Sequence, residues 1–573
     1  MNHTLQVAAW LAVAITFQAC ESQRTGGSNY AKGDSAVKVE DLQAQKVDEA
    51  KISNVEMVGV EDYAVVQMAP PPGASHKFTA PVIMSDEQNK VKQIDFETED
   101  YDRIEDNPFY SVTSRPLSTF SIDVDRAAYS NVRRFINDGM MPPKGAVRIE
   151  EMVNYFHYAY PQPVGDQPFS INTELGASPW NPQNYLLHIG LQGREVPVEN
   201  LPATNLVFLL DVSGSMEDDN KLPLVKESLL LLADKLRPQD QVAIVVYAGN
   251  AGLVLPGTPG NKKERINQAL ENLQAGGSTA GGEGIQLAYK VARENFLKNG
   301  NNRVILCTDG DFNVGPSSDD ELVEMIERER KSGVFLTVLG FGMGNYKDNK
   351  MQQLADKGNG NHGYIDNISE ARKTLLEEFG GTLFTIAKDV KLQMEFNPAT
   401  VQAYRLIGYE NRLLNDEDFN DDTKDAGEIG SGHTVTALYE IVPVGVKSDL
   451  VRKTDELKYS KPTSGAAGNT SDLVTIKFRY KKPDEEASRL LTHVVPAQPA
   501  SVDGLSDNFR FSAAVAQFGM LLRESPYRQQ SSFQSVLNLA NKGRGNDEGG
   551  YRSEFISLVH KAHHLKPREV AAK

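Results

Sequence analysis

An apolar run meets a cluster of oxygen-bearing side chains at Leu206-Val207-Phe208-Leu209-Leu210-Asp211-Val212-Ser213-Gly214-Ser215-Met216. The first five residues are all Leu, Val or Phe, which predicts a strand buried on both faces of a parallel sheet. Asp211, Ser213 and Ser215 follow at the carboxyl end of that strand, where open α/β folds bind their ligands. One carboxylate with several neutral oxygens suits a hard divalent cation such as Mg2+, which prefers octahedral oxygen coordination. The stretch therefore predicts an α/β fold with a metal site at one edge of its sheet.

Two later segments carry residues that would complete such a site. Thr279 lies in the glycine-rich segment 276–282, just before a predicted helix, and Asp309 follows a predicted strand at 303–308. With them, Asp211-x-Ser213-x-Ser215 resembles the metal-ion-dependent adhesion site of von Willebrand factor type A (VWA) domains. All five ligand positions of that family are filled in order by the expected residue types.

The resemblance implies a role for each of these residues. Asp211, Ser213 and Ser215 would supply the core oxygen ligands, while Thr279 and Asp309 would bind the ion directly or through water. The ion would be Mg2+, or Mn2+ or Ca2+ in its place. The remaining coordination position would be taken by an Asp or Glu of a protein partner. Helix capping is the alternative explanation, but it accounts for each segment separately and not for their joint occurrence.

An enzyme is a second functional class to weigh. A strand followed by Asp-x-Ser-x-Ser superficially resembles the haloacid dehalogenase-like phosphatases, which use Mg2+ and an aspartate nucleophile, here Asp211. Those enzymes usually need a second acid two residues on for proton transfer, and that position is Ser213. The chain also lacks a G-x-S-x-G elbow, a Walker loop and H-E-x-x-H. We therefore expect a binding module rather than an enzyme.

A third possibility is an accessory subunit of an envelope or channel complex, because related proteins are sometimes described as calcium-activated chloride channel homologues. Beyond the amino-terminal apolar stretch, no run of the sequence approaches the roughly 20 apolar residues that span a bilayer. Formation of a pore by this chain alone is therefore not expected.

Two further groups of residues suggest weaker metal sites. Asp218 and Asp219 follow the motif at a spacing that resembles integrin β subunits, where paired aspartates help to hold a second cation. The alternative is a solvated acidic turn before a helix. His560, His563 and His564 lie at helical spacing, but no cysteine or second cluster completes a zinc site there.

The composition indicates an acidic, mostly globular protein of two or three domains. The 573 residues are 24% charged and 40% hydrophobic, as in ordinary globular chains. The formal net charge of −17 argues against nucleic acid as a partner, because surfaces that bind phosphates are basic. We therefore expect a protein ligand.

The two cysteines have different predicted roles. Leu5–Ala19 is mostly apolar, too short for a membrane span, and placed where a signal peptide would be. It ends at Ala19-Cys20, which resembles the bacterial lipoprotein signal and implies a lipid anchor on Cys20. The alternative is a plain secretory signal. We expect the protein in the bacterial cell envelope, on the periplasmic side or the cell surface, and Cys307 as a buried thiol of an apolar strand.

The pattern of elements predicts the fold class. Strands alternate with helices through the A domain, which predicts a Rossmann-like, mainly parallel sheet between helices. Gly252–Leu255 is predicted to add a short antiparallel strand, and Ser369–Ala387 to form the last helix. β-rich segments on both sides predict a β-sandwich into which the A domain is inserted. Asp125 is predicted to cap a helix at 127–136.

We divide the chain into six parts and leave its oligomeric state open. They are a signal peptide (1–19), a mostly disordered tether (20–106), an N-terminal VWA-flanking region (107–203), the VWA domain (204–387), a β-rich flanking domain (388–504) and a helical C-terminal region (505–573). The N-terminal VWA-flanking region closely resembles the corresponding region of a family of bacterial envelope proteins that carry a VWA domain, and the helical C-terminal region resembles the carboxy-terminal domain of the same family.

Overall fold

The apolar strand that precedes Asp211 lies inside a six-stranded sheet. This strand, β5 (Thr204–Asp211), is buried at every position. The computed structural model describes residues 99–278, 281–310, 312, 319–344, 346–377, 384–424, 426–451, 471–501 and 504–566. All of them belong to one compact unit. The predicted signal peptide, Cys20, most of the predicted tether and Thr279 lie outside the described residues.

The sheet of the A domain has the order β10-β9-β8-β5-β6-β7. β10, β9, β8, β5 and β6 run parallel to one another, and β7 pairs antiparallel with β6. The predicted antiparallel strand is therefore confirmed. The other strands are β6 (Gln241–Tyr247), β7 (Ala251–Pro259), β8 (Asn301–Thr308), β9 (Val334–Phe341) and β10 (His362–Ile365).

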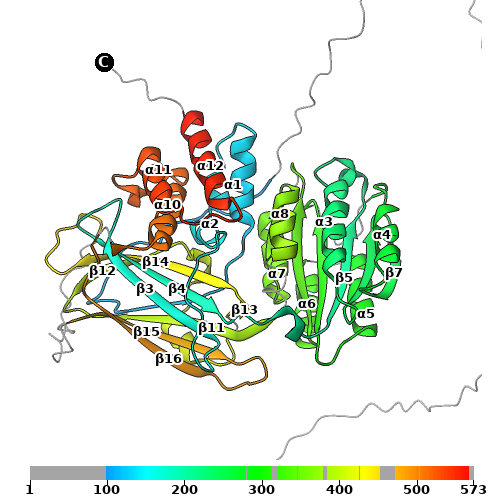
Figure 1. Cartoon of the computed structure of the whole chain (residues 1–573), viewed down its shortest axis with the longest axis horizontal. Coiled ribbons are helices and arrows are strands. Elements are labelled where there is room, and N and C mark those ends of the chain that lie inside the picture. The colour runs from blue at the N-terminus through cyan, green and yellow to red at the C-terminus, as the bar shows by residue number, and fades with distance from the viewer. Residues whose placement is uncertain are drawn as a thin grey trace, which may run out of the picture. The chain divides into compact units, whose positions relative to one another are not determined.

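Helices cover both faces of this sheet (Figure 1). One face packs against α3 (Leu222–Lys235), α4 (Lys263–Glu271) and α8 (Ile368–Arg372). The other packs against α5 (Gly281–Glu294), α6 (Asp319–Lys331) and α7 (Asp348–Lys357). Successive residues of β5 alternate between these two cores, because side chains on a strand point to opposite faces. The predicted fold, helices on both sides of a mainly parallel sheet, is confirmed.

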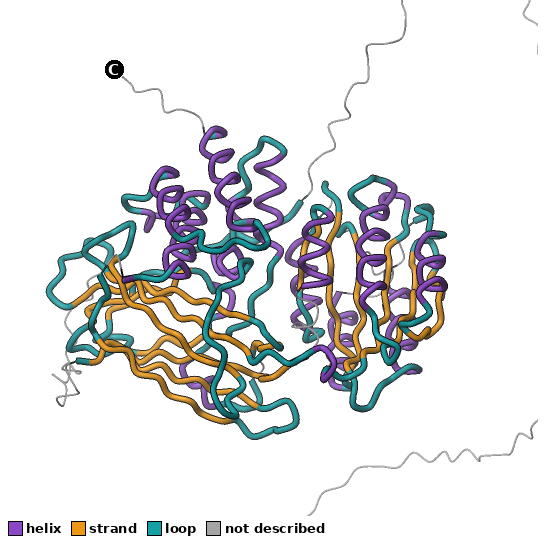
Figure 2. The backbone as a smooth tube through the Cα atoms, viewed as in Figure 1, coloured by secondary structure: helices purple, strands orange, loops and turns teal. Residues whose placement is uncertain are grey.

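Strands from both sides of the A domain build a β-sandwich (Figure 2). Its first sheet has the order β1-β12-β14-β4-β3, and its second has the order β13-β11-β15-β16, with β2 paired to β11. The two sheets share one apolar core. The strands are β1 (Tyr110–Ser111), β2 (Leu117–Ser121), β3 (Phe169–Ala177), β4 (Tyr185–Gly193), β11 (Thr385–Phe396), β12 (Val401–Ile407), β13 (Gly427–Gly430), β14 (Thr434–Pro443), β15 (Asp472–Lys481) and β16 (Arg489–Pro496).

A cluster of helices covers the outer face of the first sheet. It combines α1 (Ala127–Asn137) and α2 (Ile149–Asn154) with α10 (Asp507–Leu522), α11 (Phe533–Lys542) and α12 (Tyr551–Leu565). Their apolar side chains form one core with Leu186, Ile407 and Leu438 of the sheet. The N-terminal flanking region and the C-terminal region thus fold together. Among the described residues, no helix has the length and apolarity that a membrane crossing requires.

Two local predictions were wrong. The helix expected at Ser369–Ala387 ends early, because α8 passes into a π-helical turn at Lys373–Glu377 and Thr385 already begins β11. Asp125 does not cap α1, because the N-cap position is occupied by Arg126, which makes no side-chain cap hydrogen bond. The Asp125 carboxylate instead accepts hydrogen bonds from the backbone N–H of His362 at 2.9 Å and from the Arg412 guanidinium at 2.9 Å. A tertiary ion pair outweighs the local cap here.

His188 lies on β4 between the sandwich and the helix cluster. It is 1% exposed, and its Nε2 lies 2.9 Å from the hydroxyl oxygen of Tyr160. Its ring also lies against that of Phe509 on α10. Burial lowers the pKa of His188 to about 3, so the side chain is neutral in the folded protein at neutral pH.

We expect His188 to make the protein less stable in acid. Its pKa in the folded protein is below the value of about 6.5 in an unfolded chain, so between these values the unfolded chain binds more protons. As the pH is lowered from about 6, the free energy of unfolding should therefore decrease. His188 alone should contribute a decrease of up to about 1.4 kcal/mol per pH unit. H188Q should remove this part of the slope in urea unfolding at successive pH values. The exposed His560 provides the control variant H560Q; equal slopes in wild type and H188Q would contradict the prediction.

Candidate metal centre

Two buried carboxylates meet at the carboxyl edge of the A-domain sheet. Asp211 ends β5 and is 1% exposed, and Asp309 directly follows β8 and is 0% exposed. β5 and β8 are adjacent and parallel, so their carboxyl ends lie at the same edge. Burial raises the pKa of Asp211, and the negative charge of Asp309 raises it further. The arrangement therefore places two acids together in a poorly hydrated environment.

Asp211 is fixed in orientation by hydrogen bonds. Its Oδ1 accepts from the backbone N–H of Ser213 at 2.9 Å. Its Oδ2 accepts from the hydroxyls of Tyr247, at the end of β6, at 3.0 Å and of Thr308, at the end of β8, at 3.4 Å. Groups from three neighbouring strands thus hold this carboxylate in one position.

The two serines of the motif lie side by side. Ser213 is buried and Ser215 is exposed, and their hydroxyl oxygens are 3.1 Å apart. Adjacent ligands of an octahedral Mg2+, each about 2.1 Å from the ion, are about 3 Å apart. This spacing fits two neighbouring ligands of such an ion. The exposure of Ser215 places it on the open side of the site.

The segment that leads to Thr279 contacts the motif loop. The backbone N–H of Gly276 donates to the carbonyl of Val212 at 2.7 Å, and that of Gly214 donates to the carbonyl of Gly277 at 3.0 Å. Gly277 has φ of +86°, a conformation that favours glycine. The structure thus brings together Asp211, Ser213, Ser215 and Asp309, and holds residues 276–278 against them.

The predicted second metal pair lies on the surface. Asp218 and Asp219 are both exposed, and the nearest described cation to Asp218 is Lys221, 3.9 Å away. Among the described residues, no cluster of three or more His, Cys, Asp or Glu side chains is suited to a metal. A cation at the motif would therefore depend on two carboxylates, hydroxyls and water, which is the donor set that Mg2+ prefers.

Lys221 is a site residue that the sequence reasoning missed. Its Nζ donates to Asp309 Oδ2 at 3.1 Å and to the carbonyl oxygen of Ser215 at 2.9 Å, and its side chain is 8% exposed. One sequence signal could have revealed it. Lys221 directly precedes α3, and a cation is unfavourable at a helix N-terminus unless another group compensates it.

Comparison with known proteins identifies the family of this chain. It is 44% identical over 470 residues to "Uncharacterized protein YfbK" of Escherichia coli (strain K12), and the match covers 80% of each chain. The chain belongs to the YfbK family. Residues 381–565 match the family described as "Uncharacterized protein YfbK, C-terminal". Residues 205–378 match the family described as "von Willebrand factor type A domain", and residues 95–188 match the one described as "von Willebrand factor". The predicted relationship to bacterial VWA-domain proteins is confirmed.

More distant relatives of this YfbK-family chain share less of its length. "Uncharacterized protein sll0103" of a Synechocystis strain is 25% identical over 48% of this chain and 66% of its own. Human inter-alpha-trypsin inhibitor heavy chain H3 is 30% identical over 29% of this chain and 19% of its own. A solved structure, "von Willebrand factor type A from Catenulispora acidiphila", covers 69% of this chain and 91% of its own at 15% identity and a TM-score of 0.37. The VWA domain supports an interaction or adhesion module, and such domains commonly bind a divalent metal.

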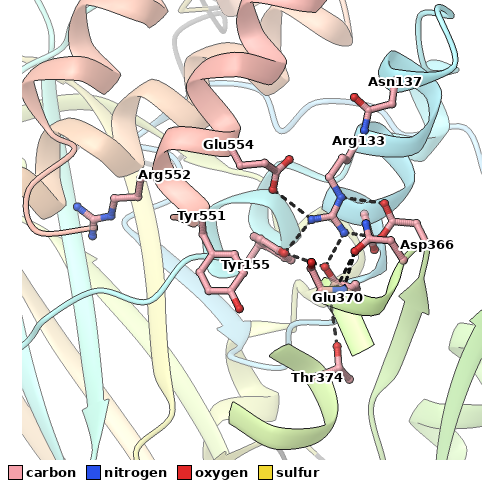
Figure 3. Close-up of polar contacts among 12 residues, drawn as sticks. Arg133, Asn137, Tyr155, Asp366, Glu370, Thr374, Tyr551, Arg552 and Glu554 are labelled. Atoms are coloured by element: carbon pink, nitrogen blue, oxygen red, sulfur yellow. Dashed lines mark hydrogen bonds and ion pairs between the residues drawn. The ribbon is translucent and has the colours of Figure 1, made fainter. Parts of the chain in front are cut away.

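In this YfbK-family chain a second polar cluster lies at the same edge of the sheet, where β10 ends (Figure 3). Arg133 of α1 is its centre and is 5% exposed. Its guanidinium donates to Asp366, which follows β10, to Glu370 of α8 at 2.6 Å and to Glu554 of α12 at 3.2 Å. Tyr155 donates to the same Glu370 oxygen at 2.7 Å. Arg133, in the N-terminal flanking region, therefore joins that region to the A domain and to the helical C-terminal region.

We expect the loss of this arginine to destabilise the junction strongly. R133M would leave Asp366 and Glu370 buried without their cation, and removal of one partner of a buried ion pair costs about 3–5 kcal/mol. The measurement is the midpoint of chemical denaturation. R103M is the matched control, because Arg103 pairs with Glu105 in solvent and such pairs contribute about 1 kcal/mol or less. A change below about 1 kcal/mol in R133M would contradict the assignment.

Proposed function

We propose that this protein is a lipid-anchored bacterial envelope protein whose VWA domain binds a protein partner through a divalent cation, with Mg2+ as the first candidate. Asp211, Ser213, Ser215, Thr279 and Asp309 would hold the ion. The observation that carries the proposal is the meeting of two buried carboxylates with two serine hydroxyls 3.1 Å apart at one sheet edge. The ion would act as a Lewis acid toward an Asp or Glu of the partner.

Each residue of the site contributes a separate part of this function. Asp211 would be the oriented anionic ligand, because Tyr247 and the Ser213 N–H leave it little freedom to rotate. Ser215 would mark the side from which the partner approaches, because it is exposed while Asp211 and Asp309 are buried. Neutral hydroxyl ligands leave positive charge on a bound divalent ion, so that it favours a further anionic ligand.

The first test is metal binding by the purified protein. Isothermal titration with Mg2+ should give one ion per chain, and D211A should weaken binding by about 100-fold or more, because it removes a directly bound carboxylate. D234A removes an exposed carboxylate from α3 and should bind as wild type does. D218A with D219A tests the second ion, and unchanged stoichiometry there would exclude it. Equal Mg2+ affinity in wild type and D211A would contradict the site.

The second test concerns the partner. Capture from native bacterial envelopes should yield a protein that elutes with EDTA and is absent when D211A is the bait, provided circular dichroism shows D211A to be folded. Capture that is unchanged in EDTA would rule out the metal-dependent mechanism. Release of phosphate from a general phosphatase substrate, lost in D211A, would favour the enzyme instead.

The anchor makes a separate prediction. Expressed in a bacterium that processes lipoproteins, the wild-type chain should carry a lipid on Cys20 and fractionate with membranes. C20S should lose both properties, as shown by mass spectrometry of the amino terminus. A secreted wild-type chain without lipid would contradict the anchor and leave the metal site unaffected.

A further inference from the structure

A lysine ammonium lies inside the proposed metal centre. Lys221 Nζ is 3.1 Å from Asp309 Oδ2 and 2.9 Å from the carbonyl oxygen of Ser215. The Lys221 side chain is 8% exposed and that of Asp309 is 0% exposed. The ion pair is therefore shielded from water. Charges interact more strongly in such surroundings than in bulk water. Lys221 contacts two of the segments that would supply ligands to the cation.

The fold provides a place for this lysine. Its aliphatic part passes over Gly342, which directly follows β9 and has φ of +75°. A Cβ at that position would lie 2.5 Å from Lys221 Cε and 2.6 Å from Cγ. The positive φ of Gly342 and the close approach of the lysine both favour glycine at this position. The ends of β5, β8 and β9 together position the ammonium beside Asp309.

We propose that Lys221 sets the charge of the metal centre, so that the centre binds a divalent cation less tightly but presents that cation to an anionic ligand. This inference rests on the proposed function of the same site. Asp211 and Asp309 carry two negative charges, and Lys221 offsets one of them. A bound divalent cation then leaves the centre with one net positive charge, which an Asp or Glu of the partner neutralises. Without Lys221 the loaded centre would be neutral.

The charge argument gives two effects of opposite sign. Removal of the ammonium should strengthen the binding of Mg2+ alone, because two uncompensated carboxylates attract it. The same change should weaken the binding of a carboxylate to the loaded centre. A lysine that only supports the loop would produce a different result, because its loss would disturb Ser215 and Asp309 and weaken both.

The closing experiment measures Mg2+ affinity by isothermal titration in a set of matched variants. K221Q should bind Mg2+ at least about tenfold more tightly, as expected for loss of one nearby charge in a shielded site. K221R keeps the charge and should stay within about twofold of wild type. K226Q should also stay within about twofold, because Lys226 lies on α3, which directly follows Lys221, but donates to the carbonyl oxygens of Glu271 and Leu273. Equal or weaker Mg2+ binding by folded K221Q would overturn the inference.

The carboxylate effect is tested with acetate on the Mn2+-loaded protein, followed by water-proton relaxation as acetate displaces bound water. Acetate affinity should fall by at least about threefold in K221Q and stay unchanged in K221R and K226Q; an unchanged or higher affinity in K221Q would overturn the inference.

Folding of the variants is monitored by circular dichroism, with K221M as a second deletion of the charge. K221Q and K221M that fold only when Mg2+ is present would support the inference, because the ion then replaces the missing cation. Failure of both to fold in Mg2+ would overturn it. If wild type binds Mg2+ and D211A does not, the proposed function stands even when K221Q shows no gain in Mg2+ affinity. If neither wild type nor K221Q binds Mg2+, both the proposed function and the inference about Lys221 are overturned.

Discussion

The burial of Asp211 and Asp309 at the ends of adjacent parallel strands is the constraint on which the candidate site depends. Parallel pairing forces both carboxylates to the same edge of the sheet, and the apolar strands β5 and β8 behind them exclude water. Like charges in such surroundings repel one another strongly. The structure meets this cost with hydroxyl donors around Asp211 and with the ammonium of Lys221 beside Asp309. A divalent cation between Asp211 and Asp309 would reduce their repulsion further. The burial of the two carboxylates would therefore favour the binding of a metal ion.

Ion pairs join the A domain to the rest of the fold at both ends of β10, the carboxyl end near Asp366 and the amino end near His362. Arg133 from α1 takes its anionic partners from the end of β10, from α8 and from α12. On the sandwich side, Arg412 pairs with Asp123, Asp125 and Asp356. Both arginines are largely shielded from solvent, and all of these pairs except Arg412–Asp356 link segments more than 200 residues apart. Regions on both sides of the A domain therefore act as its structural support, and the family relationship extends over them as well.

Much of the fold was predictable because its determinants are local. The all-apolar run before Asp211 predicted a doubly buried parallel strand, and the alternation of strands and helices predicted the layers around it. Antiparallel β7 was also foreseen. The helix at Ser369–Ala387 failed, since Thr385 and the residues after it pair with β13 in the sandwich, and this pairing outweighs helical spacing. The prediction that Asp125 caps a helix was wrong for a related reason. Arg412, which is distant in the sequence, is a stronger partner for this carboxylate than a helix N-terminus is.

The sequence by itself determined the residue types and order of the metal motif, the parallel α/β class and the family. These follow from side-chain chemistry at short spacing and from periodicity. Only the tertiary structure decided that Asp309 shares its environment with Lys221, that α1 and α2 fold with the C-terminal helices, and that strands on both sides of the A domain close one sandwich. Charge compensation in a buried site depends on which groups meet in space, and sequence separation says little about that. In the proposed function, the Asp-x-Ser-x-Ser motif would supply ligands to a cation, and the fold determines which charges surround them.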